Sequence, residues 1–216
     1  MLWAWAVSAA LAAPPLPSFT DDRVLYTWSQ VNSLIESACV VDARTGQQAC
    51  NPEPLQLAID KASAWMDQVR PDARLHYLVG LAHRGRGEDA KATAAYEAAI
   101  ALDPKRQDAW HDLGELRLAS GDLRGAKKAF EEVAELVPDG PASWVGPYRL
   151  AEVAAFEHQP AAFEVHMKEA LRRGFTFRQI AHLPAWKGFY ADPKLRDTVE
   201  KLILVYGTHD ILESLK

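Results

Sequence analysis

The sequence has 216 residues, of which 49% are hydrophobic and 25% are charged, and its formal net charge is −5. This composition is that of an ordinary globular protein and excludes a chain that is disordered throughout. Lysine and arginine are interspersed with the acids and form no basic block, so the sequence also argues against a nucleic-acid-binding protein.

The N-terminus is an uncharged apolar run from Leu2 to Ala13, followed by a proline-rich stretch. The run is shorter than the roughly 20 residues that a membrane-spanning helix needs. Ala10-Leu11-Ala12 fits the small-x-small pattern of a cleavage site, although no basic residue precedes the run. We therefore expect residues 1–13 to be a signal peptide and the mature chain to be exported; the alternative is a disordered or membrane-touching tail.

Residues 14–72 are expected to form a divergent helix pair. Apolar residues recur at helical spacing between Asp21 and Ser37 and again between Pro54 and Val69. A short segment without this spacing separates the two stretches. The pattern therefore predicts two helices with a small insert between them.

The only two cysteines, Cys39 and Cys50, lie in this insert and flank a turn-rich segment that contains Gly46. In an exported protein, this arrangement predicts a disulfide that closes a small hairpin. The rival interpretations are a pair of metal ligands and a redox site, but the spacing fits neither and no nearby histidine completes a metal set. Closing so short a loop contributes roughly 2–3 kcal/mol to stability in the chain-entropy model.

An internal repeat follows, in which residues 73–106 align with residues 107–140 at an offset of 34 positions. Each copy holds two stretches with apolar residues at a period of 3.6, which predicts two helices. A glycine stands where the first helix must stop, and a proline ends the second. The aligned pairs are Gly80 with Gly114, Gly87 with Gly121, Ala92 with Ala126, Tyr96 with Phe130, and Pro104 with Pro138.

The second copy has Trp110, Leu113, Gly114, Gly121, Asp122, Ala126, Phe130 and Pro138 at regular places. Their spacing resembles that of the tetratricopeptide repeat, and the first copy departs from it at His76 and His83, which replace two aromatic residues. The resemblance implies an all-α fold, a short right-handed α-solenoid of stacked helix hairpins. Residues 73–106 would be its first repeat and residues 107–140 its second. One hairpin cannot bury its own apolar face, so about three repeats are needed for stability.

The segments after these two copies extend the array. Residues 141–174 are expected to be a degenerate third repeat, because two more helical stretches follow after the register slips by three residues in the sequence DGPAS. Residues 175–216 resemble the helical cap that often closes such arrays, with Asp192-Pro193 at one of its steps.

Catalytic and metal-binding motifs are missing from the sequence, which lacks HExxH, Gly-x-Ser-x-Gly, a phosphate loop and CxxC. His76 and His83 are seven residues apart on one expected helix and could share a face. Both stand at packing positions of the repeat, which favours a role in filling gaps between helices over a metal pair. We therefore expect no catalytic residue, no metal and no cofactor.

The resemblance implies a concave groove lined by the first helices of successive repeats, where a partner segment would bind. In the degenerate third copy, the groove positions can be placed only at their nearest equivalents. The expected partner-contact residues are Arg74, Tyr77, Leu81, Arg84, Asp108, His111, Glu115, Leu118, Tyr148 and Glu152. Their mixture of charged, aromatic and aliphatic side chains suits a peptide or a helix of another protein.

The sequence thus predicts a non-catalytic protein–protein interaction scaffold of the bacterial cell envelope, periplasmic after signal cleavage, with no nucleic-acid partner and no membrane span. The Lys and Asn pattern by which some members of the family hold chaperone tails is missing, so that partner class is not expected. The alternatives are a structural subunit that assembles through the array ends and an enzyme or metal protein on a repeat scaffold. A simpler rival is that the groove is a solvated face without a partner.

Overall fold

The computed structural model describes residues 19–41, 48–180 and 184–215. The expected signal peptide, residues 1–13, and the expected turn at Gly46 lie outside these ranges. Within them, no helix is both long and apolar enough to cross a bilayer. The helices are α1 (Phe19–Ala38), α2 (Pro52–Gln68), α3 (Ala73–Gly85), α4 (Asp89–Leu102), α5 (Gln107–Ala119), α6 (Leu123–Leu136), α7 (Val145–Phe156), α8 (Pro160–Arg172), α9 (Pro184–Ala191), α10 (Arg196–Tyr206) and α11 (His209–Leu215), with the 3₁₀ helix η1 (Phe177–Ile180) and the strands β1 (Cys39–Val41) and β2 (Gln48–Cys50).

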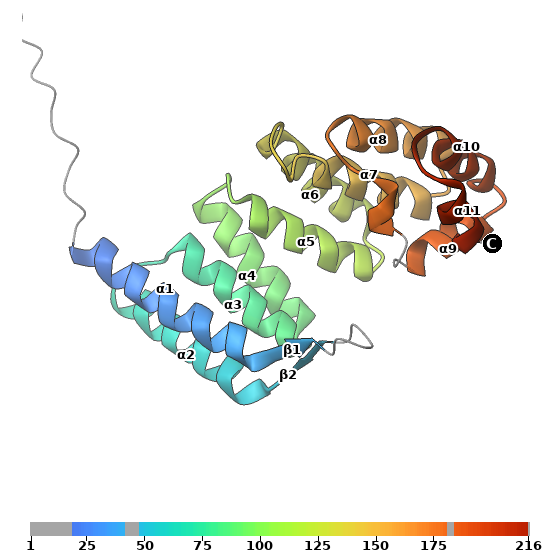
Figure 1. Ribbon diagram of the computed structural model, residues 1–216. Coiled ribbons are helices and arrows are strands. Elements are labelled where there is room, and N and C mark those ends of the chain that lie inside the picture. Colours follow the sequence, from blue (N-terminus) through green and yellow to red (C-terminus); the bar gives the residue numbers. More distant parts are fainter. Residues whose placement is uncertain (1–18, 42–47, 181–183, 216) are drawn as a thin grey trace, which may run out of the picture.

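In the described part of the chain, four helix hairpins follow one another along a single array, namely α1–α2, α3–α4, α5–α6 and α7–α8 (Figure 1). The two helices of each hairpin pack against each other, and neighbouring hairpins meet through α2 and α3, α4 and α5, and α6 and α7. The shorter helices α9, α10 and α11 fold over the C-terminal end (Figure 1). The predicted all-α solenoid of stacked hairpins is confirmed.

In each of the two central hairpins, a glycine of the first helix packs against an aromatic ring of the second helix. A β-carbon on Gly80 would lie 2.4 Å from Cε1 of Tyr96, and one on Gly114 would lie 2.5 Å from Cε1 of Phe130. Both rings are fully buried, so neither can move aside without disturbing the core. Glycine therefore sets how closely α3 approaches α4 and α5 approaches α6.

The hairpin α7–α8, which is the third repeat, packs with different side chains at these two positions. Ala151 and Met167 stand in the same register as Gly114 and Phe130, and both are fully buried. A methyl group replaces the hydrogen of glycine, and a flexible unbranched side chain replaces the rigid ring. His158, with a φ of 56°, also takes the place of the turn glycine Gly121, whose φ is 81°. The third repeat thus keeps the geometry of the first two with little of their sequence.

The N-terminal hairpin carries the predicted insert between α1 and α2. β1 and β2 pair antiparallel with Cys39 opposite Cys50, and the two cysteines form a disulfide. The predicted disulfide hairpin is therefore confirmed. It packs against the end of α3, because a β-carbon on Gly85 would lie 3.6 Å from each sulfur atom and 2.9 Å from Cδ1 of Leu55. The insert thus joins α1, α2 and the first repeat.

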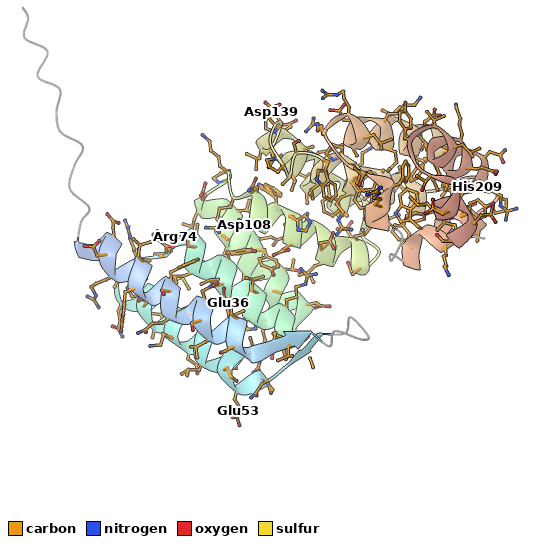
Figure 2. The ribbon with its side chains drawn as sticks, in the orientation of Figure 1. Glu36, Glu53, Arg74, Asp108, Asp139 and His209 are labelled. Carbon is orange, nitrogen blue, oxygen red and sulfur yellow. A yellow bond between two sulfur atoms is a disulfide. The ribbon has the colours of Figure 1, made fainter. Side chains whose placement is uncertain are left out.

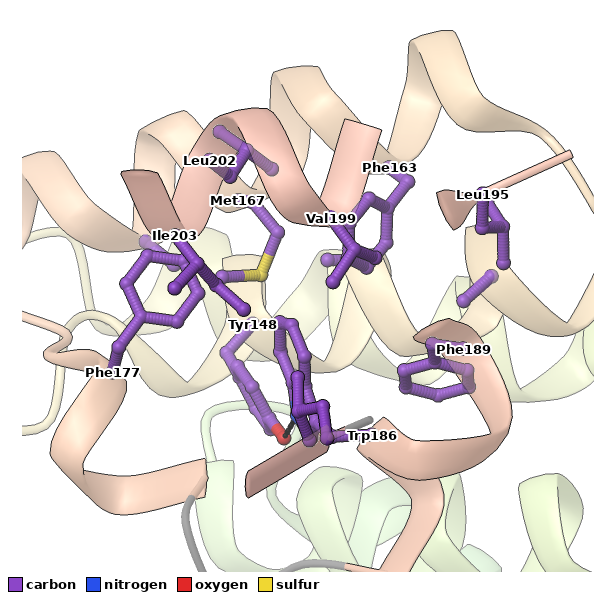
Figure 3. Packing of buried hydrophobic residues seen from close by; sticks show 14 of the residues in the cluster. Tyr148, Phe163, Met167, Phe177, Trp186, Phe189, Leu195, Val199, Leu202 and Ile203 are labelled. Carbon is purple, nitrogen blue, oxygen red and sulfur yellow. Dashed lines mark hydrogen bonds between the residues drawn. The ribbon is translucent and has the colours of Figure 1, made fainter. Parts of the chain in front are cut away.

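The C-terminal core gathers aromatic side chains from α7, α8, η1 and α9 (Figure 3). Trp186 of α9 is fully buried, and its Nε1 donates a hydrogen bond to the hydroxyl of Tyr148 at 3.0 Å. The rings of Phe163, Phe177 and Phe189 surround it, with centroids 5.9, 5.7 and 5.8 Å from the centroid of Trp186. These side chains cover the end of the array where another repeat would otherwise stack.

The linker between hairpins α5–α6 and α7–α8 is longer than the one before it. Residues 137–144 join α6 to α7, whereas residues 103–106 join α4 to α5. α7 still lies close against α6, because a β-carbon on Gly146 would lie 2.6 Å from the backbone nitrogen of Ala134. The extra residues are therefore accommodated in the linker, where they help to line a hollow beside α5.

Candidate functional site on the groove face

The first helices of the hairpins, α1, α3, α5 and α7, define one side of the array, which we call the groove face. Glu36 of α1, Arg74 of α3 and Asp108 of α5 mark these helices in Figure 2. The expected partner-contact residues come from α3, α5 and α7. Two hollows lie along this side, and residues of α3 and α5 line both of them.

The first hollow, which we call the α5 hollow, has a volume of about 290 Å³. Side chains of α3 and α5 make its polar side. Side chains of α6, the long linker and the start of α7 make its apolar side. The lining residues are Tyr77, Gln107, Asp108, His111, Asp112, Val133, Val137, Ala142 and Val145.

The second hollow, which we call the α3 hollow, has a volume of about 560 Å³ and lies between α1, α3 and α5. The disulfide borders it through Cys39. The lining residues are Ile35, Glu36, Cys39, Leu81, Arg84, Gly85 and Asp112. The two hollows therefore share Asp112.

Asp112 connects α5 to α3 at the centre of the groove face. Its Oδ2 accepts a hydrogen bond from the hydroxyl of Tyr77 at 3.0 Å, and its Oδ1 lies 3.3 Å from Nη1 of Arg84. Sequence reasoning missed Asp112, because the repeat alignment places it at the position of Leu78, which is a buried core residue in the first copy. An acid where the sister repeat buries a leucine is the signal that could have revealed it.

Arg106 joins two of the expected contact residues, Tyr77 and Asp108. Its guanidinium forms an ion pair with Asp108 and lies over the ring of Tyr77, 5.0 Å from the centroid. Burial and the negative charges of Asp112 and Asp108 raise the pKa of Tyr77, which keeps the phenol protonated as a donor. His111 lies beside this group, with Nδ1 3.3 Å from Oδ1 of Asp112. The structure thus brings Tyr77, Arg84, Asp108 and His111 together around the α5 hollow and Asp112.

Glu115, Tyr148 and Glu152 gather around Arg149 of α7. Nε of Arg149 lies 3.0 Å from Oε1 of Glu115, and its Nη1 lies 2.5 Å from Oε2 of Glu152. The hydroxyl of Tyr148 donates to Oε1 of Glu152 at 2.8 Å. Burial would lower the pKa of Arg149, but the carboxylates of Glu152 and Glu115 raise it, so the cation is retained. This cluster ties α5 to α7 and satisfies the charge of Glu115 internally.

The structure places Tyr148 and Glu152 in the interior, which is at odds with their expected role as partner-contact residues. Their side chains are buried, with 4% and 5% of the residue surface exposed. Trp186 of α9 packs over Tyr148, and Glu152 is enclosed by Tyr148 and Arg149. The expectation placed them by repeat register alone, which did not show that the C-terminal cap covers this part of α7.

Arg74, Leu81 and Leu118 also have partners within the chain. Asp72 caps α3, accepts a hydrogen bond from the backbone nitrogen of Arg74 at 2.9 Å, and pairs with its guanidinium at 2.8 Å. Leu81 packs against the buried apolar cluster of α1, α2 and α3 and lines the α3 hollow. Leu118 packs against the buried cluster around Phe130. Of these three residues, only Leu81 lines either hollow.

The histidines expected to fill gaps between helices lie in separate surroundings. His76 is half-buried, and burial lowers its pKa while the carboxylate of Asp72 acts in the opposite direction. Nδ1 of His83 lies 2.6 Å from Oε2 of Glu88. Among the residues that the structure describes, no three metal-ligating side chains gather at one place. That the protein works without a metal or cofactor stays a prediction.

The stacked hairpins and their groove face define a helical-repeat protein of the α-solenoid class. Residues 81–144 match the family model described as Tetratricopeptide repeat. This part of the chain therefore carries tetratricopeptide repeats, as the spacing of the two central copies indicated.

Two curated proteins are similar to about a third of this chain. Superkiller complex protein 3 of Mus musculus is 36% identical over 78 residues, which are 36% of this chain and 5% of that protein. The probable biofilm formation methyltransferase WspC of Pseudomonas putida is 31% identical over 77 residues, which are 36% of this chain and 18% of that protein. The chain therefore spans a small part of the length of these relatives.

A solved structure covers more of the chain. The kinesin light chain TPR-like repeats of Podosopora anserina superpose with a TM-score of 0.55 at 12% sequence identity, over 89% of this chain and 93% of that one. At this identity, the likeness shows the shared fold alone.

Proposed function

We propose that this chain is an interaction module that binds a segment of a partner protein on its groove face. Tetratricopeptide repeat proteins are generally protein–protein interaction scaffolds, because stacked repeats create extended binding surfaces. The observation that carries the proposal is the pair of hollows on α3 and α5, whose linings share Asp112. Their lining combines aliphatic, aromatic and charged side chains, as protein interfaces do.

We propose that the module acts without catalysis of its own. The histidine and the acids of the groove face have partners within the chain: His111 contacts its neighbour Asp112 on α5, and Glu115 pairs with Arg149 of α7. A nucleophilic mechanism would need a hydroxyl or thiol beside such a base, whereas the linings of the two hollows include no serine or threonine and their one cysteine, Cys39, is in the disulfide. The WspC similarity does not argue otherwise, because it covers 18% of that methyltransferase.

The proposed location is the bacterial cell envelope. The disulfide between Cys39 and Cys50 supports an oxidising compartment, since glutathione and thioredoxin keep most cytosolic thiols reduced. The apolar run and cleavage pattern of residues 1–13 agree with export. The mass of the chain recovered from a periplasmic extract tests this proposal: we expect a mature form that begins near Ala13, and a full-length reduced chain in the cytosol would contradict it.

The experiment that tests partner binding removes a matched pair of charges from the groove face. Reversing Arg84 alone would place a second negative charge beside Asp112 and could disturb the scaffold. Arg84→Ala combined with Asp112→Ala removes both members of the pair and leaves no unmatched charge. We expect the wild-type chain to capture a partner from envelope extract and this double variant to lose it while its helical circular dichroism is unchanged.

The matched control removes an ion pair outside the groove face. Glu164 and Lys168 of α8 form such a pair at 2.8 Å, and Glu164→Ala with Lys168→Ala should leave capture intact. A partner retained by the Arg84 and Asp112 variant would refute groove-face binding. A partner lost equally from both double variants would show that the effect is not specific to this face.

A second candidate function is assembly through the C-terminal end of the array. Val165 of α8 and Leu204, Val205 and Tyr206 of α10 are each at least 50% exposed, although they are large and apolar. Lys201 of α10 lies 3.2 Å from the carboxylate of Glu164, so the two helices present these side chains near one another. Contiguous apolar surface of this kind marks interaction sites. Light scattering tests this function, and a monomer at high concentration would contradict self-assembly.

A further inference from the structure

The α5 hollow has a chemical polarity that points to one kind of partner segment. One side of its lining is apolar and consists of Val133, Val137, Val145 and the methyl group of Ala142. Val133 is 4% exposed and is fixed in the core. An aliphatic side chain inserted here would bury its surface against these groups, at roughly 25 cal/mol per Å² of apolar area.

The side of the same hollow that α5 lines is acidic. Asp108 and Asp112 stand four residues apart on α5, so both carboxylates lie on the same side of the helix and face the hollow. No lysine or arginine lines the α5 hollow, and Arg84 is the one basic residue that lines the α3 hollow. Together the two linings hold three carboxylates, those of Glu36, Asp108 and Asp112, and the guanidinium of Arg84, while Arg106 pairs with Asp108 from beside the α5 hollow.

The internal ion pairs leave part of the acidic side of the hollow exposed. Nη1 of Arg84 lies 3.3 Å from Oδ1 of Asp112, and the side chains of these two residues are 40% and 14% exposed. The carboxylate of Asp108 is paired with Arg106, and the side chain of Asp108 is 38% exposed. Asp108 is therefore the carboxylate of α5 that a further cation can best reach from solvent.

We propose that the α5 hollow binds a cationic, apolar peptide segment, with an aliphatic side chain against the valines and a neighbouring lysine or arginine on Asp108 and Asp112. This proposal rests on the proposed function and names the chemistry of its partner. The long linker from α6 to α7 is the structural reason for the specificity, because Val137 and Ala142 belong to it and the shorter linker of the preceding repeat supplies no equivalent lining.

Three fluorescein-labelled peptides, which share one Gly-Ser spacer, test separately whether the hollow needs the aliphatic side chains and the positive charges. The first carries two leucines and two lysines, the second two leucines and two glutamates, and the third two serines and two lysines. Binding to the full chain is measured by fluorescence anisotropy. We expect the first peptide to bind at least about tenfold more tightly than either of the others, and its advantage over the second to shrink as salt is added.

Two variants assign the effect to the hollow. Asp108→Asn should weaken the first peptide by about tenfold and change the second by less than about twofold. Val137→Thr, which keeps the shape but adds a hydroxyl, should weaken the first peptide and leave the third unchanged. Asp139→Asn is the matched control, because it removes the same charge from an exposed linker residue that does not line the hollow (Figure 2).

The proposal is overturned if the glutamate peptide binds as well as the lysine peptide, if no peptide binds at about 1 mM, or if Asp139→Asn weakens binding as much as Asp108→Asn. These results can be separated from a failure of the proposed function. Loss of a captured partner in the Arg84 and Asp112 variant, without a preference for the cationic peptide, would retain groove-face binding and refute only the partner chemistry. Retention of the captured partner would refute both.

Discussion

The central hairpins α3–α4 and α5–α6 and the C-terminal segment from α7 to α11 bury their side chains in different ways. In the central hairpins, a glycine in one helix receives an aromatic ring from the next, as Gly114 receives Phe130. In the C-terminal segment, the rings come from elements far apart in the sequence and meet around Trp186. The first arrangement repeats, whereas the second closes the array and forms once.

This difference separates the parts of the molecule that extend the array from those that end it. A repeat must present the same surface to the next copy, so its contacts are local and recur at a fixed offset. At an end of the array, that surface must be covered by side chains on which no further repeat can stack. The C-terminal end uses an aromatic cluster, and the N-terminal end adds the disulfide between Cys39 and Cys50.

The largest effect is expected from truncating the centre of the C-terminal cluster. Trp186→Ala removes a fully buried ring and the hydrogen bond to Tyr148, and it should lower the free energy of unfolding by about 3–5 kcal/mol. Urea denaturation measures the loss. Trp110→Ala is the matched control, because Trp110 is half-buried on α5 and should cost clearly less. Equal losses would contradict the central role of the cluster.

A smaller effect is expected at the N-terminal end. Replacing Cys39 and Cys50 by serine opens the hairpin and should cost about 2–3 kcal/mol, because the unfolded chain regains the entropy that the disulfide removed. Reduction of the wild-type protein should give the same loss in urea denaturation. If the double variant unfolds at the same urea concentration as the oxidised protein, the disulfide does not stabilise this end.

The packing of glycine against an aromatic ring in the central hairpins can be tested by giving one hairpin the side chains of the third repeat. Gly114→Ala places a methyl group against the ring of Phe130 and should cost about 1–3 kcal/mol, despite the better helix propensity of alanine. Adding Phe130→Met reproduces the natural pair of Ala151 and Met167. The double variant should be more stable than the two single losses predict, by at least about 0.5 kcal/mol. Additive losses would show that the two positions are not coupled.

The smallest effect concerns the acid stability of the hairpin α7–α8. Hydrogen bonds from Arg172 and Arg173 lower the pKa of Glu169 from its usual 4.5 to about 2. Because the folded-state pKa is below the unfolded one, this contribution is present above pH 4.5 and is lost as the pH falls towards about 2. Glu169→Gln should therefore reduce the pH dependence of the free energy of unfolding in this window. An unchanged pH dependence in this variant would contradict the stabilising role of these two hydrogen-bonded pairs.

Sequence reasoning reached the features that depend on local or repeated patterns. The offset between the two central copies places Gly80 and Gly114 against their rings, and the spacing of Cys39 and Cys50 around a turn indicates the disulfide. Each of these signals lies within one hairpin or recurs in the next. These features can therefore be recognised in the sequence without knowledge of the contacts between distant segments.

The residues that sequence reasoning misplaced depend on contacts between distant segments. Tyr148 and Glu152 were assigned to the groove by register, but Trp186 of the tail covers Tyr148 and encloses this part of α7. Asp112 was overlooked because its register position is buried in the first copy. The hollow beside α5 could not be foreseen either, since it is lined partly by Val137 and Ala142 of a linker whose path is not set by the repeat.

The most direct test of groove-face binding is photo-crosslinking in the native cells. A photoreactive residue replaces the exposed Gln107, which lines the α5 hollow, or the exposed Lys128 of α6, a second helix of its hairpin. We predict that position 107 yields a crosslink to another protein and that position 128 does not. Crosslinking from position 128 without any from position 107 would contradict the claim that the groove face is the binding surface.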